Sequence, residues 1–108
     1  MISLVTDNLD KIAALCRQYR IQKLELFGSA TGEAWDSDTS DIDFIADLGD
    51  YEVGVADRYL DFAHALEALF GRRVDLLTPP MITNPYFRQA VNEQRVTIYE
   101  AGDRKAAA

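Results

Sequence analysis

The chain has 108 residues, 48% of them hydrophobic, which predicts one domain with a single ordinary core. Its formal net charge of −7 argues against direct binding to nucleic acid, which requires a basic surface, and favours a basic protein partner. One cysteine and one histidine exclude an internal disulfide and a zinc site built from these residue types. No signal peptide and no apolar run of membrane-spanning length is present, so no membrane contact is expected and the expected location is the cytoplasm.

The hydrophobic pattern predicts the order helix, strand, turn, strand, helix, strand, helix, strand. The expected helices span about residues 8–19, 52–70 and 85–93, and the expected strands span residues 21–27, 40–48, 72–77 and 96–99. Expected helix boundaries are Thr6 or Asp7, Asp50 and Asn84 as N-caps, and Gly71 as a C-terminal stop. This order favours an α+β fold, a small mixed sheet with helices packed on one face. Residues 1–100 would form the domain and residues 101–108 a disordered tail.

The turn Phe27-Gly28-Ser29 at the end of the first strand is a candidate phosphate-binding site. Gly28 can approach a ligand closely because it has no Cβ. Backbone N–H groups and the Ser29 hydroxyl at a strand-to-helix turn suit a phosphate.

A pair of aspartates follows in Ser40-Asp41-Ile42-Asp43. Residues two apart on a strand share a face, so Asp41 and Asp43 should project together. Two carboxylates on one face repel each other unless a cation lies between them, and Mg²⁺ prefers a few carboxylate oxygens completed by water and substrate phosphates. The alternative is a solvated strand face, which would be the better interpretation of two aspartates without their context.

A third carboxylate, Asp75, lies in the apolar run Arg73-Val74-Asp75-Leu76-Leu77. Val74 and Leu76 would share the buried face, which leaves Arg73 and Asp75 together on the other. Arg73 could bind a phosphate there or form a structural ion pair with Asp75.

The order Phe-Gly-Ser, loop, Ser-Asp-Ile-Asp, helix and Val-Asp-Leu resembles the minimal nucleotidyltransferases (MNT) of the DNA polymerase beta superfamily, by motif from about Leu24 to Leu77. The resemblance implies that Asp41 and Asp43 bind Mg²⁺. It implies that Asp75 is a further ligand or a general base, and that the Gly28-Ser29 turn holds ATP. Many small members are antitoxins encoded beside a HEPN-domain toxin, and some transfer AMP from ATP to a tyrosine of that toxin. The resemblance therefore implies a HEPN toxin as partner in a hetero-oligomer, with adenylylation (AMPylation) as the activity.

The sequence departs from this family after the Gly-Ser turn. Ala30 and Thr31 stand where the family often has arginines, and the loop before the aspartates is about one residue longer. These departures motivate a second hypothesis, a catalytically weak or inactive module that neutralises the toxin by forming a complex. A transferase acting on nucleic acid or a small molecule is a third hypothesis, disfavoured by the acidic charge and the lack of room for a substrate domain.

Four further residues have more than one possible role. Cys16 lies on the apolar stripe of the first helix, which indicates a buried core thiol. Trp35 either packs over the sheet edge or serves as a lid, a base-stacking group or a partner anchor. Arg58 and His64 fit a loose HEPN ribonuclease spacing, but the strands exclude an all-helical fold and six residues on a helix point the two side chains apart.

Overall fold

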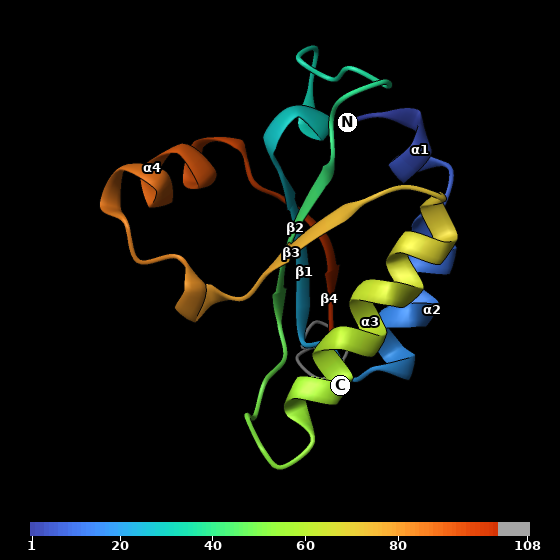
Figure 1. The fold of residues 1–108 in the computed structure, drawn as a ribbon, viewed down its shortest axis with the longest axis vertical. Coiled ribbons are helices and arrows are strands. Elements are labelled where there is room, and N and C mark those ends of the chain that lie inside the picture. The colour runs from blue at the N-terminus through green and yellow to red at the C-terminus, as the bar shows by residue number, and fades with distance from the viewer. Residues whose placement is uncertain (102–108) are drawn as a thin grey trace.

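The computed structural model describes residues 1–101, and its centre is a four-stranded mixed sheet with strand order β3-β2-β1-β4 (Figure 1). The strands are β1 (Lys23–Phe27), β2 (Ile42–Asp47), β3 (Val74–Leu77) and β4 (Val96–Glu100). Strand β1 pairs antiparallel with β2 and with β4, whereas β2 and β3 are parallel. The predicted fold class, an α+β fold with a small mixed sheet, is confirmed.

The helices are α1 (Ser3–Thr6), α2 (Leu9–Gln18), α3 (Val55–Phe70) and α4 (Pro85–Gln94), with 3₁₀ turns η1 (Gly28–Thr31) and η2 (Pro79–Met81). The Asn84 side chain caps α4 by accepting hydrogen bonds from two backbone N–H groups, and Gly71 ends α3 in the left-handed conformation. Both features match the prediction. The predicted cap by Asp50 is wrong, because α3 begins only after Gly54, which has a φ of 91° and turns the chain into the helix. The caps predicted at Thr6 and Asp7 are also wrong, because α1 occupies that segment and α2 begins after Asn8.

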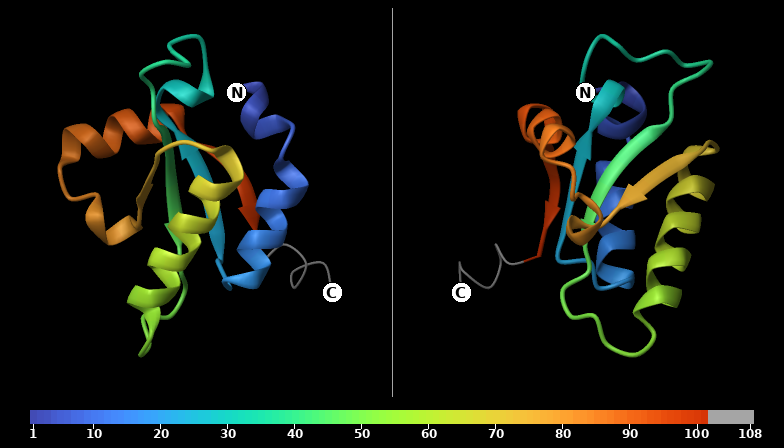
Figure 2. Two further views of the ribbon diagram at one scale, coloured as in Figure 1. Left: turned by 45° about the vertical axis from the view of Figure 1, so that its right-hand side comes forward. Right: turned by 60° about the vertical axis from the view of Figure 1, so that its left-hand side comes forward.

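One face of the sheet carries the main core, which α2 and α3 cover (Figure 2). Alternate residues of the two central strands, among them Leu24, Leu26 and Phe44, are fully buried against Phe62 and Leu66 of α3. Cys16 is also fully buried, and burial raises the pKa of its thiol to about 12, which confirms the core thiol.

Helix α4 lies on the opposite face of the sheet, away from α2 and α3 (Figure 2). Its Val91 packs with Phe27, Ile45 and Ile82 in a second, smaller cluster. The expectation that the helices pack on one face therefore holds for α2 and α3 only. The physical reason is that β1 and β2 present apolar side chains on both faces, so the second face also needs a cover.

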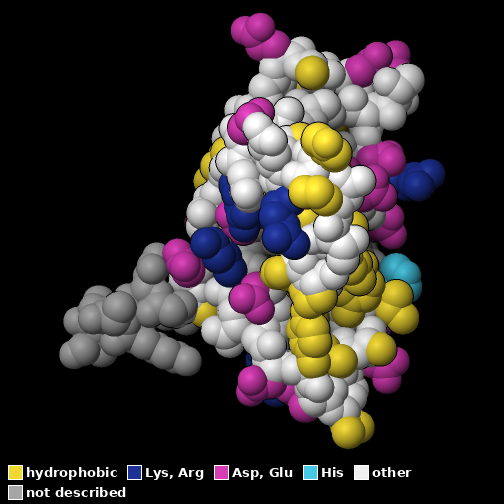
Figure 3. Space-filling model, turned by 90° about the vertical axis from the view of Figure 1, so that its left-hand side faces the viewer, with side chains coloured by type: hydrophobic (Ala, Val, Ile, Leu, Met, Phe, Trp, Pro, Cys, Tyr) yellow, Lys and Arg dark blue, Asp and Glu magenta, His cyan; other side chains and the backbone are white. Residues whose placement is uncertain are grey.

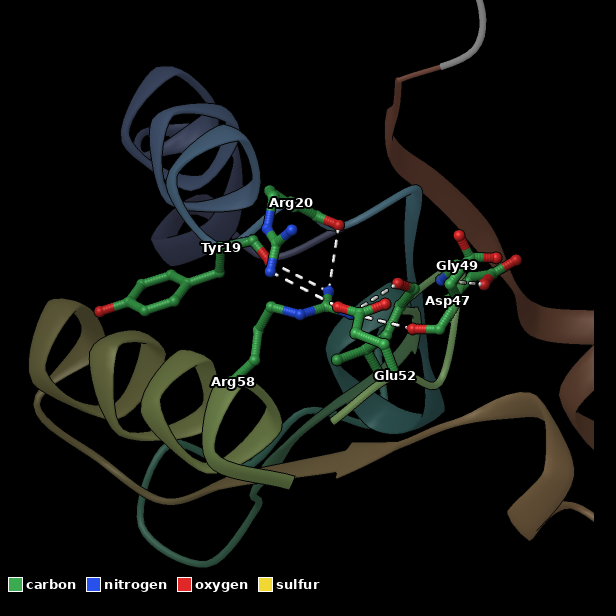
Figure 4. Close-up of polar contacts among 8 residues, drawn as sticks. Tyr19, Arg20, Asp47, Gly49, Glu52 and Arg58 are labelled. Atoms are coloured by element: carbon green, nitrogen blue, oxygen red, sulfur yellow. Dashed lines mark hydrogen bonds and ion pairs between the residues drawn. The ribbon is translucent and has the colours of Figure 1, made fainter. Parts of the chain in front are cut away.

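Arg58 of α3 is buried and ties together the ends of several elements (Figure 4). Its guanidinium donates to four backbone carbonyls and pairs with the Glu52 carboxylate at 3.4 Å. The carbonyls belong to Tyr19, Arg20, Leu48 and Asp50. This residue is therefore a structural link, while His64 on the same helix is exposed, and the two do not form a ribonuclease pair.

The predicted tail begins at Ala101, whose N–H donates to the Gln22 carbonyl at 2.8 Å, and the rest of it lies outside the described residues. Within residues 1–101, no helix combines the length and the apolar character that a membrane crossing requires.

Candidate functional site

The Gly-Ser turn forms η1 directly after the central strand β1. Gly28 has a φ of 77°, and a Cβ built on it would overlap the Asp43 carboxylate, so no other residue fits this close approach. The Gly28 N–H is aimed outward and donates to the side-chain oxygen of Gln94 at 3.2 Å, and the Thr31 hydroxyl donates to the Gly28 carbonyl at 2.7 Å. The turn thus places a backbone donor beside a carboxylate.

Asp43 and Asp75 lie directly opposite each other on the parallel strands β2 and β3. Residues in register on paired strands share a face, and this face also carries Phe27, which is in register with Asp43 on the other side. Asp41 precedes β2 by one residue and lies two positions before Asp43. The structure therefore places the predicted carboxylates of β2 and β3 next to one another, beside the Gly28 turn.

The local electrostatics of Asp43 show a crowded group of negative charges. Burial, the neighbouring Asp75 carboxyl group and the charge of Asp41 together raise the pKa of Asp43 to about 7. A carboxyl group with such a pKa is costly to ionise without a cation, so a bound cation would relieve the repulsion.

The donor set suits Mg²⁺, which usually takes one or two carboxylates and completes its shell with water and phosphate oxygens. Asp43 and Asp75 supply carboxylate oxygens, and the lack of a Cβ at Gly28 lets the Asp43 carboxylate approach the backbone of the turn. No cluster of three potential ligand side chains already converges on one point within residues 1–101. A cation here would therefore be held by few protein oxygens and would depend on substrate oxygens for the rest.

Arg73 contacts Asp41 rather than Asp75, with 3.9 Å between its Nε and the Asp41 carboxylate. The side chain of Arg73 is 78% exposed, and that of Asp41 is 34% exposed. The predicted ion pair with Asp75 is wrong, because Arg73 precedes β3 and its long side chain turns toward the start of β2. Exposed pairs of this kind contribute little, so Arg73 can leave Asp41 at small cost.

Asp43 and Asp75 line an open pocket of about 480 Å³, and the other residues around it are mostly apolar. Tyr59 of α3 and Phe87 of α4 line it together with Phe27. The Tyr59 hydroxyl donates to the Leu76 carbonyl, and burial together with the Asp75 charge raises the pKa of this phenol. Helical spacing places Tyr59 and Phe87 on the apolar sides of their helices, but it does not show that they line this pocket, and no sequence pattern points to Gln94.

The loop that leads to Asp41 is fastened to the start of β3. Arg72 lies 4.6 Å from the centre of the Trp35 ring and donates to the carbonyls of Ser37 and Ser40. Trp35 is half-buried against the main core, so the packing interpretation of this residue is confirmed. The loop thereby fixes the entry into β2 just before the aspartate pair.

The nucleotidyltransferase domain family matches residues 9–98. MJ1379 of Methanocaldococcus jannaschii, named as a candidate protein adenylyltransferase, is 32% identical over 82 residues, which are 75% of this chain and 80% of that protein.

Two solved toxin–antitoxin structures share the fold. One, described as a toxin–antitoxin with AMP-PNP, has a TM-score of 0.66 at 24% identity and covers 93% of this chain and 79% of that chain. The other, a tri-AMPylated Shewanella oneidensis HEPN toxin in complex with an MNT antitoxin, has a TM-score of 0.61 at 21% identity and covers 94% of this chain and 77% of that chain. Since the family match spans most of the residues and MJ1379 agrees with it, the chain belongs to the nucleotidyltransferase domain family.

Proposed function

We propose that this chain is a Mg²⁺-dependent protein adenylyltransferase that acts as an antitoxin, transferring AMP from ATP to a tyrosine hydroxyl of a HEPN-fold toxin. The observation that carries the proposal is the pairing of Asp43 with Asp75 in register, directly beside the Gly28 turn. A metal-bound nucleoside triphosphate requires hydrogen-bond donors for its phosphates next to carboxylates for its metal, and the turn and the two aspartates supply this arrangement.

Each site residue has a role in this proposal. The Gly28 N–H and the Ser29 hydroxyl bind the phosphates of ATP. Asp41, Asp43 and Asp75 hold Mg²⁺, which when bound offsets negative charge on the attacking and leaving oxygens. Arg73, released from Asp41, binds a phosphate oxygen through its guanidinium group.

The reaction is an in-line displacement at the α-phosphorus. The acceptor oxygen forms a new bond to this phosphorus while the bond to the bridging oxygen of pyrophosphate breaks, and the electron pair leaves with pyrophosphate. Where Asp75 is not itself a metal ligand, it accepts the proton of the incoming hydroxyl, and its exposed position on an edge strand leaves access for that group.

Known relatives support this assignment from two sides. MJ1379 is named for adenylyl transfer to protein. The structural neighbours pair an MNT antitoxin with a HEPN toxin that carries AMP, or hold an ATP analogue. The partner and the acceptor residue of this chain follow from them by analogy.

The direct test incubates the purified chain with labelled ATP, Mg²⁺ and the HEPN-fold protein encoded beside it. We expect label on the partner and a mass increase of one or more AMP units. Asp43→Asn should abolish transfer, whereas Asp47→Asn, the same change at an exposed position of the same strand, should preserve it. Equal labelling by wild type and Asp43→Asn would contradict the proposal.

A second function, neutralisation by complex formation alone, is favoured by Ala30. Alanine carries no charge, so the position after Ser29 offers no cation to a triphosphate, and its side chain is instead fully buried. The combined change Asp41→Asn and Asp43→Asn separates the two functions in cells that express the toxin. Loss of protection supports catalysis, and full protection assigns neutralisation to binding.

A further inference from the structure

An apolar groove of about 370 Å³ lies on the surface along the N-terminal half of α3. Tyr51, Leu60 and Met81 line it and are 53%, 50% and 52% exposed. Figure 3, which views the molecule from this side, shows hydrophobic side chains gathered in the lower half of the face. Contiguous exposed apolar surface of this kind marks a site of interaction.

The groove adjoins the candidate active site at Tyr59. The same ring lines both the groove and the pocket that contains Asp43 and Asp75. Its hydroxyl bond to the Leu76 carbonyl fixes the ring between the two spaces. A segment bound in the groove would therefore lie directly beside the carboxylates.

Two acidic residues neighbour the residues that line the groove: Asp50 directly precedes Tyr51, and Asp57 lies about one helical turn before Leu60 on α3. Both are exposed and form no ion pair within residues 1–101. The single lysine or arginine between residues 49 and 71 is Arg58, which is buried. The rim therefore presents negative charge around an apolar floor, which complements a partner with apolar side chains flanked by basic ones.

We propose that this groove docks the protein substrate, through a segment whose apolar side chains enter the groove while lysine or arginine residues meet the acidic rim. This inference rests on the proposed function, since it assigns the surface by which the acceptor protein places its hydroxyl near Asp75. A second copy of this chain is a poor occupant, because two chains of charge −7 would bring like rims together.

The test uses Leu60→Asp and Met81→Asp, with Leu9→Asp on α2 as the matched control. All three side chains are partly exposed, at 50%, 52% and 37%, so each change is compatible with folding. The dissociation constant of the complex with the HEPN-fold protein is measured by calorimetry, and kcat and KM for AMP transfer are measured in parallel. We expect both groove variants to raise the dissociation constant and KM by at least about tenfold, as a charge buried in an apolar contact should. Their kcat and ATP affinity should stay unchanged, and the control should match wild type.

A second variant tests the rim separately. Replacing Asp50 and Asp57 together by lysine should weaken association and flatten its dependence on salt, because electrostatic complementarity mainly sets the association rate. A salt dependence identical to wild type would contradict a basic partner at this rim.

The outcomes separate this inference from the proposed function. If wild type binds without transferring AMP and the groove variants lose binding, the groove stands and the catalytic proposal fails. If wild type transfers AMP and the groove variants keep its KM, the groove is overturned and the function stands. Wild type that neither binds nor modifies the HEPN-fold protein overturns both. Groove variants that instead dissociate a dimer of this chain reassign the surface to a second copy and overturn the inference.

Discussion

At position 28 even a methyl group would overlap the Asp43 carboxylate, and the φ of 77° would strain any residue that carries a side chain. The donor of this turn is already in use, because Gly28 N–H bonds the side-chain oxygen of Gln94. The neighbouring Asp43 carboxylate forms no ion pair within residues 1–101 and faces the like charges of Asp75 and Asp41. The chemistry of the site thus depends on two groups, the Gly28 N–H, which already forms a hydrogen bond, and the Asp43 carboxylate, which lies among like charges.

Asp43→Asn should stabilise the protein in the absence of metal. The change removes a charge that burial and the carboxylates of Asp75 and Asp41 disfavour. After allowance for its partial exposure to solvent, we expect a gain of about 1 kcal/mol in the free energy of unfolding at pH 8. Thermal unfolding with and without Mg²⁺ checks this result. Wild type should gain stability on adding Mg²⁺ and the variant should not, while a Mg²⁺ response retained by the variant would place the metal elsewhere.

Gln94→Ala should tighten ATP binding. The Gln94 oxygen accepts the hydrogen bond that a phosphate would take from the Gly28 N–H, so ATP must displace it. An intramolecular hydrogen bond contributes about 0.5–1.5 kcal/mol, which corresponds to at most about a tenfold gain in affinity. Calorimetric titration with ATP at fixed Mg²⁺ measures it, with Gln89→Ala on the same helix as the control. Weaker binding would show that Gln94 assists the nucleotide.

At the scale of elements, Arg58 joins the end of α2, the end of β2 and the start of α3. Its Nε is buried without a hydrogen-bond partner within residues 1–101, although the terminal nitrogens are well used. A second link joins β1 to the segment after α4, where Arg95 pairs with the buried Glu25 carboxylate. Both links connect segments far apart in the sequence, so they hold the two sides of the sheet in place.

Arg58→Met should lower the free energy of unfolding by about 3–5 kcal/mol, because it leaves four carbonyls without this donor and Glu52 without its buried partner. Chemical denaturation measures the loss. Arg58→Lys keeps the charge with fewer donors and should cost less. The exposed Arg17 on α2 provides the control, since Arg17→Met should change stability by no more than about 0.5 kcal/mol. Equal effects at positions 17 and 58 would contradict the structural role.

The Glu25–Arg95 link should give stability a defined dependence on pH. The hydrogen bond from Arg95 lowers the pKa of Glu25 below its ordinary value despite burial. A carboxyl group with a lowered folded-state pKa contributes stability above its unfolded pKa of about 4.3 and loses it as pH falls through the folded value. Wild type should therefore lose stability faster than Glu25→Gln as pH falls below about 4. Denaturation midpoints from pH 7 to pH 3 check this, and parallel curves would contradict it.

At the scale of the whole molecule, the order of the strands determines whether a shortened chain can fold. A chain ending at Leu77 keeps every predicted site residue but loses α4 and β4. The second edge of β1 and the apolar pair Phe27 and Ile45 would then be uncovered. We expect this fragment to aggregate or to lack cooperative unfolding, since unpaired strand edges and exposed apolar surface promote association. Circular dichroism and light scattering on the fragment test it, and a soluble, cooperatively folding fragment would contradict the expectation.

Local pattern predicted what depends on neighbours in sequence. The Asn84 cap, the Gly71 stop and the turn at Gly28 all follow from short-range geometry, whereas the register of Asp43 with Asp75 comes from the pairing of two distant strands. The sequence pattern did not predict features that depend on contacts between residues far apart in the chain. The side of the sheet taken by α4, the Tyr59 wall of the pocket and the Gln94 contact each depend on residues from separate elements. Periodicity shows that a side is apolar, but it does not show which surface that side will meet.

The position of β4 has a consequence for synthesis of the protein. The three aspartates and the turn leave the ribosome first, but the central strand β1 gains its second neighbour only when residues 96–100 have followed. During translation the nascent chain therefore exposes one edge of its central strand until residues 96–100 have been made. The complete sheet can form only after these residues are added, and chaperones would have most to protect in that interval.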